Sequence, residues 1–152
     1  MSAMTENGLT TWVGVDGTPQ SVVRTAKYGF PLMIAITGGS PTRFAPYVDL
    51  YGRAAEQFGT TAHPVGMHSP GFVADTDEQA RELRWPRYKL MRDRIGAPET
   101  VARKMAAAIK GLGVGRFDMI YGSGAMPVSA RLRAVELYGT KAVPMVRDIL
   151  AG

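Results

Sequence analysis

The sequence predicts an α/β domain built on a parallel sheet, and three observations support this. Short apolar runs alternate with longer segments of helical periodicity, an order typical of right-handed β-α-β connections. The run Pro31–Ile36 is apolar at every position, as expected of a strand buried on both faces of a parallel sheet. A Gly-(Thr/Ser/Ala)-Pro sequence recurs at residues 17–19, 39–41 and 96–98, and each copy stands where a helix is expected to begin. We interpret this recurrence as shared turn chemistry.

The segment Trp12–Ser21 is the first predicted strand–turn–helix unit. Residues 12–15 are predicted to form the strand, and residues 18–28 the helix. Thr18 is expected to cap the free backbone N–H groups, and Pro19 suits the first helical position. Such a helix start presents N–H donors and a positive dipole end, for which a phosphate is the usual ligand. The unit is therefore a candidate anion site.

Two further strand–helix units are predicted to follow. Residues 31–36 form the second strand, and the helix that begins at Ser40-Pro41 ends at Gly59. Residues 65–74 form the third strand, which Ser69-Pro70-Gly71 is expected to bend or bulge. The second helix is expected to bury an apolar stripe at helical spacing, made of Phe44, Tyr47, Val48, Tyr51, Ala55 and Phe58.

Two helices are predicted next, before the last strand. The first covers residues 77–95 and begins at a capping box, in which Thr76 precedes Gln79 by three residues. Pro86 is expected to kink this helix, because proline removes a backbone hydrogen bond. The second helix begins near Pro98, where the Gly-Ala-Pro turn ends.

The last predicted strand covers residues 116–121, after a helix end at Gly111 and Gly113. A helical region over 127–151 follows it, and Gly139-Thr140 is expected to break this region. The chain is therefore predicted to alternate four strands with helices.

Length and composition indicate one soluble globular domain. The chain has 152 residues, 45% of them hydrophobic and 20% charged, which is enough for a sizeable core. We expect residues 1–11 to be a flexible lead-in and residues 12–152 a single domain. The sequence has no cysteine, which excludes disulfides and thiolate metal sites and favours a reducing compartment. It shows no signal-peptide pattern and no apolar run near the roughly 20 residues of a membrane span, so we expect a cytoplasmic protein.

The net charge of +5 raises the question of a nucleic-acid partner. Much of the excess lies in Arg81–Arg94, where six basic residues stand against two acidic ones with Trp85 and Tyr88 between them. Basic and aromatic residues together can bind single-stranded nucleic acid, whereas a solvated helix face is the simpler interpretation. We favour the solvated face, because no nucleic-acid motif accompanies the segment.

Five segments, taken in order, resemble the luciferase-like flavin-dependent monooxygenases: Trp12–Ser21, Gly38–Tyr51, Phe72–Ala80, Gly96–Lys104 and Val135–Arg147. The resemblance covers nearly the whole chain from residue 12. It implies a (β/α)8 barrel that binds a flavin, usually FMN and in some branches a deazaflavin, at the carboxyl ends of its strands. It also implies oxygen activation on reduced flavin, or hydride transfer, with a small-molecule substrate that the residues do not identify.

The resemblance is to the carboxyl half of that barrel only. The four predicted strands correspond to the family's fifth to eighth strands, whereas a complete barrel takes about 250 residues. The expected fold is therefore half of a (β/α)8 barrel. A second difference lies near Ile95-Gly96, where the family usually carries a long excursion that this chain lacks.

The resemblance assigns the flavin phosphate to the turn after the family's fifth strand. The matching residues here are Gly17, Thr18 and Ser21, through hydroxyls and backbone amides. Plain capping of the helix is the alternative role for Thr18 and Ser21. No catalytic residue is identified.

For the other candidate residues, a structural role is the better interpretation. Gly122–Gly124 follows the last strand, where barrels often hold a phosphate, but a simple turn is the better interpretation. His68 and Ser69 are adjacent on a strand and so point to opposite faces, which argues against a hydrolase. Asp16 and Asp118 lie at or within predicted strands, where a carboxylate could face a barrel mouth, and a surface salt bridge is the favoured interpretation. No cluster of His, Asp and Glu suggests a metal site.

Half a barrel leaves one sheet face and two edge strands uncovered. We therefore expect a homodimer, or a higher even oligomer, and the monomeric alternative is that helix 77–95 folds over the bare face. Two functions follow. One is a flavin-dependent oxidoreductase or monooxygenase of the luciferase-like type, and the other is a non-catalytic flavin- or phosphate-binding half-barrel that mainly oligomerises.

Overall fold

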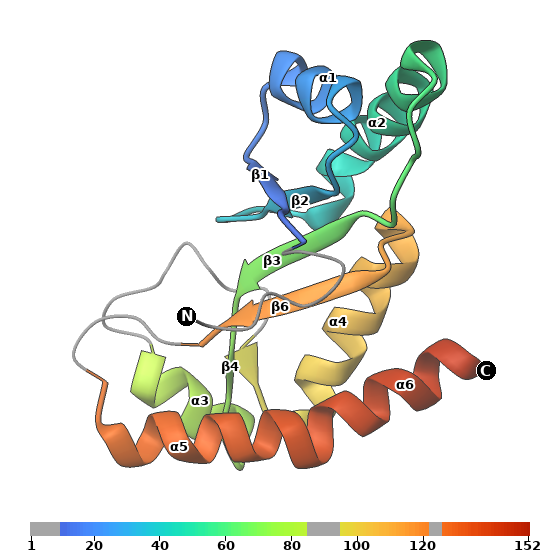
Figure 1. The fold of residues 1–152 in the computed structure, drawn as a ribbon. Coiled ribbons are helices and arrows are strands. Elements are labelled where there is room, and N and C mark those ends of the chain that lie inside the picture. The colour runs from blue at the N-terminus through green and yellow to red at the C-terminus, as the bar shows by residue number, and fades with distance from the viewer. Residues whose placement is uncertain (1–9, 85–94, 122–125) are drawn as a thin grey trace, which may run out of the picture.

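The protein contains a four-stranded parallel sheet with helices packed against it, as seen in a computed structural model that describes residues 10–84, 95–121 and 126–152 (Figure 1). The strand order is β1-β2-β3-β6, and all three pairings are parallel. The predicted α/β class with four parallel strands is therefore confirmed. The strands are β1 (Val13–Val15), β2 (Leu32–Ala35), β3 (Gly66–Pro70) and β6 (Arg116–Ile120).

Helices occupy the segments between the strands, close to the predicted bounds. The two helices of the first half are α1 and α2, and a short 3-10 turn, η1, precedes the second. The bounds are α1 (Pro19–Lys27), η1 (Pro41–Phe44), α2 (Ala45–Phe58), α3 (Asp77–Arg84), α4 (Pro98–Leu112), α5 (Val128–Leu137) and α6 (Val143–Ala151).

The helix ends follow the predicted signals. Gly59 and Gly113 end α2 and α4 in the left-handed conformation, at φ of 65° and 61°. The break expected at Gly139-Thr140 is wrong: the helix continues from α5 into α6 through a π-helical turn, η3 (Tyr138–Ala142). In the predicted capping box, the backbone N–H of Gln79 donates to Oγ1 of Thr76 at 3.1 Å.

The core lies between one face of the sheet and the helices α1, α2 and α4, which Figure 1 shows on one side of the sheet. Along the strands, Val15, Ile34 and Met67 are register partners and all three are buried in this core. Tyr51 of α2 lies against them and donates its hydroxyl to the carbonyl of Phe30 at 3.0 Å. The alternate residues therefore point to the opposite, inner face.

The third predicted strand, 65–74, is corrected by the structure. The chain bends after Pro70, as the Ser-Pro-Gly sequence indicated, but the next two residues leave the main sheet. They form β4 (Phe72–Val73), which pairs in parallel with β5 (Ile95–Gly96) in a separate two-stranded sheet. We did not predict β5, because two residues are too few to show an alternating pattern.

The predicted helix 77–95 is only partly described. Its first part is α3, which packs against β5 and so does not fold over the inner face of the main sheet (Figure 1). The monomeric alternative is therefore not supported by residues 77–84. The expected kink at Pro86 and the turn at Gly122–Gly124 lie outside the described residues.

Candidate functional site

The turns that follow the parallel strands all lie at the carboxyl end of the sheet, because the strands run in the same direction. The turn after β1 leads into α1 and contains Gly17 and Thr18. The turn after β2 leads into η1 and contains Gly39 and Ser40. The predicted anion site lies at this carboxyl end of the sheet.

Thr18 and Ser21 lie together at the start of α1. Thr18 is the N-cap residue, with an extended backbone, and its side chain makes no cap hydrogen bond to the backbone. Its hydroxyl donates instead to Oγ of Ser21 at 2.8 Å. The expected side-chain cap is therefore wrong: no backbone N–H donates to Oγ1 of Thr18, and the Thr18 side chain bonds to Ser21 instead. Thr18 is exposed, and its hydroxyl stands beside that of Ser21 at the open end of the helix.

A positive charge accompanies this hydroxyl pair. Nη2 of Arg24, one turn further along α1, lies 3.4 Å from Oγ of Ser21. The first turn of α1 contains no acidic residue. Hydroxyl donors, the helix dipole and a guanidinium together suit an anion. The sequence reasoning missed Arg24, although an Arg three residues after a helix-start Ser is a visible signal.

Gly17 has a structural role in the same turn. Its φ of 135° lies where residues with a side chain are strained, and its carbonyl accepts a hydrogen bond from the Tyr47 hydroxyl at 2.8 Å. This bond joins the turn to α2 and holds the start of α1 in place. The carbonyl of Gly17 is thus already used within the chain.

The turn after β2 is also bordered by a basic residue. Gly39 has a φ of 75°, and Nη1 of Arg43 lies 3.1 Å from the point where a Cβ on Gly39 would stand. The guanidinium Cζ of Arg43 lies 4.7 Å from the ring centroid of Phe44. Arg43 therefore lies close to this turn and is a second cation at the carboxyl end of the sheet.

The inner face of the sheet is filled at its amino end by the chain's own side chains. Cζ of Arg116 on β6 lies 5.0 Å from the ring centroid of Trp12. Atoms of Trp12 and Met33 lie 3.0 Å from the point where a Cβ on Gly66 would stand, and Met33 is buried. This face is therefore less bare than expected, because Trp12 folds over it.

The inner face becomes polar toward its carboxyl end. His68 and Asp118 are register partners on β3 and β6 and share this face. The Asp118 carboxylate accepts hydrogen bonds from Nε of Arg116 at 3.0 and 3.1 Å, so Asp118 forms the expected surface ion pair. Ser69 points the other way: it is buried and its hydroxyl donates to the carbonyl of Ile36 at 3.3 Å. His68 and Ser69 are thus separated, as predicted.

The carboxylates with shifted pKa values lie away from α1. Two hydrogen bonds lower the pKa of Asp77: the backbone N–H of Ala97 donates to Oδ1 at 2.5 Å, and the Thr100 hydroxyl donates to Oδ2 at 3.0 Å. The Arg133 guanidinium lowers the pKa of Asp75 through a hydrogen-bonded ion pair. Burial raises the pKa of Tyr138, and the Asp118 charge adds to the rise.

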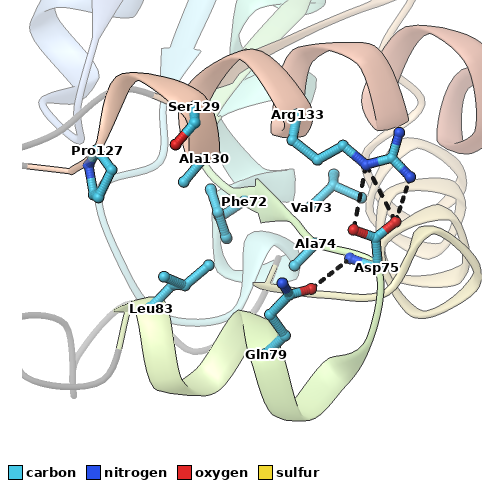
Figure 2. Close-up of a pocket in the computed structure, with 10 residues that line it drawn as sticks. All are labelled: Phe72, Val73, Ala74, Asp75, Gln79, Leu83, Pro127, Ser129, Ala130 and Arg133. Atoms are coloured by element: carbon cyan, nitrogen blue, oxygen red, sulfur yellow. Dashed lines mark hydrogen bonds and ion pairs between the residues drawn. The ribbon is translucent and has the colours of Figure 1, made fainter.

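A pocket of about 310 Å³ lies between α3 and α5, and Figure 2 shows the Asp75–Arg133 ion pair at one end of it. Leu83 of α3 and Ala130 of α5 face each other across its apolar part. Arg133 also donates to Glu136 at 2.9 Å, so its charge is already paired within the chain. The pocket therefore offers an apolar wall without a free charge.

Three further features are the basic segment, a possible metal site and membrane-spanning helices. The basic segment Arg81–Arg94 is described only in its first residues, where Arg81 forms an exposed ion pair with Glu78 at 3.4 Å. In the described part of the chain, no three His, Asp or Glu side chains come together as a metal site. Of the helices that the structure describes, none has the length and hydrophobicity needed to cross a bilayer.

The fold is similar to part of several solved enzyme structures. The monooxygenase RslO1 from Streptomyces bottropensis matches with a TM-score of 0.73 and 17% identity over 92% of this chain and 49% of that one. The oxygenating constituent of 3,6-diketocamphane monooxygenase from Pseudomonas putida, solved with FMN, matches with a TM-score of 0.68 and 17% identity, over 89% and 48%. The coenzyme F420-dependent tetrahydromethanopterin reductase from Methanopyrus kandleri gives 0.63 and 14%, over 90% and 50%.

No protein-family model matches this sequence, and no curated protein matches it. Identities of 14–17% show likeness of fold alone. This chain spans about half the length of each of these three structures. Its fold is therefore similar to half of a luciferase-like barrel.

Proposed function

We propose that this chain is a flavin-dependent oxidoreductase or monooxygenase half-barrel of the luciferase-like type. We propose that it binds FMN, or a related flavin or deazaflavin, by the phosphate at the start of α1. The observation that carries the proposal is the Thr18–Ser21 hydroxyl pair, held 2.8 Å apart at an open helix start beside Arg24. The flavin-type cofactors named for two structures of similar fold, FMN and F420, support the cofactor class.

The residues present fit a phosphate. Both hydroxyls can rotate to donate to phosphate oxygens. The backbone contributes less, because Pro19 has no N–H and that of Ser21 donates to the Thr18 carbonyl at 3.0 Å. Arg24 supplies a charge beside them, while the Tyr47–Gly17 hydrogen bond fixes the turn. When bound, a flavin supplies the redox chemistry, and the contribution of these side chains is to hold and orient its phosphate end.

We also propose the setting in which the protein works. The uncovered part of the inner face and the edge strands β1 and β6 favour a homodimer. The cysteine-free sequence favours a reducing, cytoplasmic compartment. The substrate is proposed to be a small molecule, and nucleic acid is not proposed as a partner.

A second function is favoured by the share of the barrel that this chain supplies. It spans 49% and 48% of the two monooxygenases of similar fold, so one copy provides only about half of the strand ends around which a barrel binds its ligand. The alternative proposal is therefore a non-catalytic flavin- or phosphate-binding half-barrel that mainly oligomerises. Flavin-dependent oxidation of NADH or NADPH by the purified protein would favour the enzyme, and flavin binding without turnover would favour the alternative.

The test of phosphate binding compares FMN with riboflavin, which lacks the phosphate. We expect the double variant Thr18→Ala/Ser21→Ala to bind FMN about tenfold more weakly, since hydrogen bonds to a charged group contribute about 1.5–3 kcal/mol and tenfold is about 1.4 kcal/mol. Its affinity for riboflavin should not change. Flavin fluorescence quenching measures both affinities.

The matched control is Ser129→Ala, which removes an exposed hydroxyl from the first turn of a different helix, α5. This variant should bind FMN like the unmodified protein. An equal loss of FMN and riboflavin binding in the double variant, or no FMN binding by the unmodified protein, would contradict the proposal.

A further inference from the structure

The pocket between α3 and α5 exists because the two helices face β4 and each other with alanines. Ala80 of α3 and Ala134 of α5 are buried in one apolar cluster with Phe72 and Ala74, and Ala130 packs against it. Protein interiors are otherwise close-packed, and methyl side chains are too short to fill the space between these helices. The space that remains is the pocket of about 310 Å³, which we call the α3–α5 pocket.

The α3–α5 pocket has a buried apolar base and an exposed apolar rim. Phe72 and Val73 line it and are each 1% exposed, so this part of the pocket lies inside the protein. Leu83 is 40% exposed, although it is apolar and faces Ala130 across the pocket (Figure 2). A ligand can therefore enter from solvent and cover apolar surface on both helices, as is typical of small-molecule sites.

The charged side chains at one end of the pocket are paired with each other, which favours a neutral ligand. Arg133 forms an ion pair with Asp75 and donates a further hydrogen bond to Glu136 at 2.9 Å. A charged ligand would have to break this pairing or bring an unpaired charge against the apolar wall, and both cost free energy. The ligand that suits the pocket therefore carries no net charge.

One hydrogen-bond donor lines the pocket on the α3 side. Oε1 of Gln79 accepts a hydrogen bond from the backbone N–H of Asp75 at 3.2 Å, which sets the orientation of the carboxamide. The amide nitrogen therefore lies on the other side of the carboxamide, and Figure 2 shows it on the side of Leu83 and the pocket. Because an amide nitrogen only donates, the ligand group that suits it is an uncharged acceptor such as a carbonyl oxygen.

We propose that the α3–α5 pocket binds a small neutral ring compound with a carbonyl group, its rings against Phe72 and Leu83 and its oxygen on the Gln79 amide. The volume sets the size: an apolar cavity of about 150 Å³ holds benzene, so about 310 Å³ accommodates two fused rings. The pocket shares no residue with the start of α1, and Figure 1 shows α1 and α5 at opposite ends of the molecule. This binding site therefore goes beyond the proposed flavin site and does not depend on it.

The test uses two probes of similar shape: 2-acetylnaphthalene, which has a carbonyl oxygen, and 2-isopropylnaphthalene, which has no acceptor. Equilibrium dialysis measures the affinity of each, and we expect both to bind at one site per chain. Ala130→Phe fills the pocket and should weaken the binding of both probes by about tenfold or more. The matched control is Leu132→Phe, which adds the same ring at a 67% exposed position of α5 outside the pocket and should change neither affinity.

A second variant, Gln79→Glu, tests the hydrogen bond. Glutamate keeps an oxygen for the N–H of Asp75 and preserves the capping box with Thr76, but it removes the amide donor. It should weaken the binding of 2-acetylnaphthalene by about fivefold and leave that of 2-isopropylnaphthalene unchanged. Circular dichroism checks that each variant stays folded.

Three results would overturn the proposal. Failure of both probes to bind the unmodified protein would show that the pocket is not a ligand site. Binding that a folded Ala130→Phe variant leaves intact would place the probes elsewhere on the protein. An equal effect of Gln79→Glu on the two probes would remove the carbonyl group from the proposed ligand. FMN affinity is measured in parallel and should be the same in the unmodified protein and in Ala130→Phe, so this site and the flavin site fail separately.

Discussion

Helices α1 and α4 begin with the same kind of turn and meet different partners. Each follows a Gly-Xaa-Pro sequence, with the proline in the first helical turn. At α4 the chain supplies an anion: the Asp77 carboxylate accepts from the backbone N–H of Ala97 and the hydroxyl of Thr100. At α1 the first turn has no acidic residue, and only the hydroxyls of Thr18 and Ser21 face each other.

The two helix starts differ in what the rest of the chain brings to them, and this difference is the basis for proposing an anion at α1 alone. The same local sequence pattern serves both, so the difference lies in what the rest of the fold brings to it. Asp77 comes from 20 residues earlier in the chain and occupies the α4 start permanently. At the α1 start Pro19 has no backbone N–H and that of Ser21 donates to the Thr18 carbonyl, so the groups that we propose for a ligand are the two hydroxyls and Arg24. The α1 turn is therefore the place in the described chain where we assign an external anion.

The largest expected effect is at the occupied helix start. Asp77→Asn replaces a carboxylate that accepts two hydrogen bonds, and we expect it to lower the free energy of unfolding by about 2 kcal/mol. Urea unfolding at neutral pH measures this. Asp49→Asn, on the exposed side of α2, is the matched control and should change the free energy little.

The loss of stability in Asp77→Asn should depend on pH. The pKa of Asp77 is lowered in the folded protein, so its stabilisation is complete above the ordinary Asp value of about 3.9. It is lost as the pH falls through the lower folded value. The difference between the unmodified protein and Asp77→Asn should therefore shrink below about pH 4, and a difference that grows on acidification would contradict the assignment.

The second-largest effect is expected from Thr18→Asp, which gives the start of α1 a carboxylate like the one that Asp77 supplies at the start of α4. Thr18→Asp places a carboxylate at the N-cap, where Asp is favoured, so the protein should be at least as stable as before. FMN binding should weaken by about tenfold or more, because a negative charge then opposes the phosphate. Thr18→Asn is uncharged and of similar shape, and it should bind FMN more tightly than Thr18→Asp. Equal affinities for the two variants would argue against an anion at this turn.

The smallest effect is expected on the inner face. The Arg116–Asp118 ion pair joins side chains that are 49% and 42% exposed. Pairs of this kind contribute little, so Asp118→Asn should change the free energy of unfolding by less than about 0.5 kcal/mol. Thermal unfolding in low and high salt measures this. A larger loss would mean that Asp118 has a more important partner than Arg116.

The fold could be predicted from the sequence where local patterns decide the structure. The apolar run Pro31–Ile36 contains β2, the Gly-Xaa-Pro turns start α1 and α4, and Gly59 and Gly113 end their helices. These features depend on residues close in the chain, through backbone conformation and periodicity. The short β4–β5 pair was missed, because its pairing depends on residues that are far apart in sequence.

The candidate site was less predictable than the fold. Gly17, Thr18 and Ser21 could be selected by their spacing, but the bond of Thr18 to Ser21 and the bond of Gly17 to Tyr47 depend on how α1 and α2 pack. Arg43 lies over Gly39 for the same reason. Side-chain contacts of this kind arise from tertiary structure, which a single sequence does not display.

Phosphorus NMR of FMN is the most direct test of the assignment of the α1 turn. On addition of the unmodified protein, we expect the phosphate resonance to shift or broaden, because the phosphate leaves water for the hydroxyls of Thr18 and Ser21 and the charge of Arg24. The Thr18→Ala/Ser21→Ala variant should reduce this change, and Ser129→Ala should not. A phosphate resonance that stays unchanged with the unmodified protein, while the flavin ring fluorescence is quenched, would contradict the assignment of the phosphate to α1.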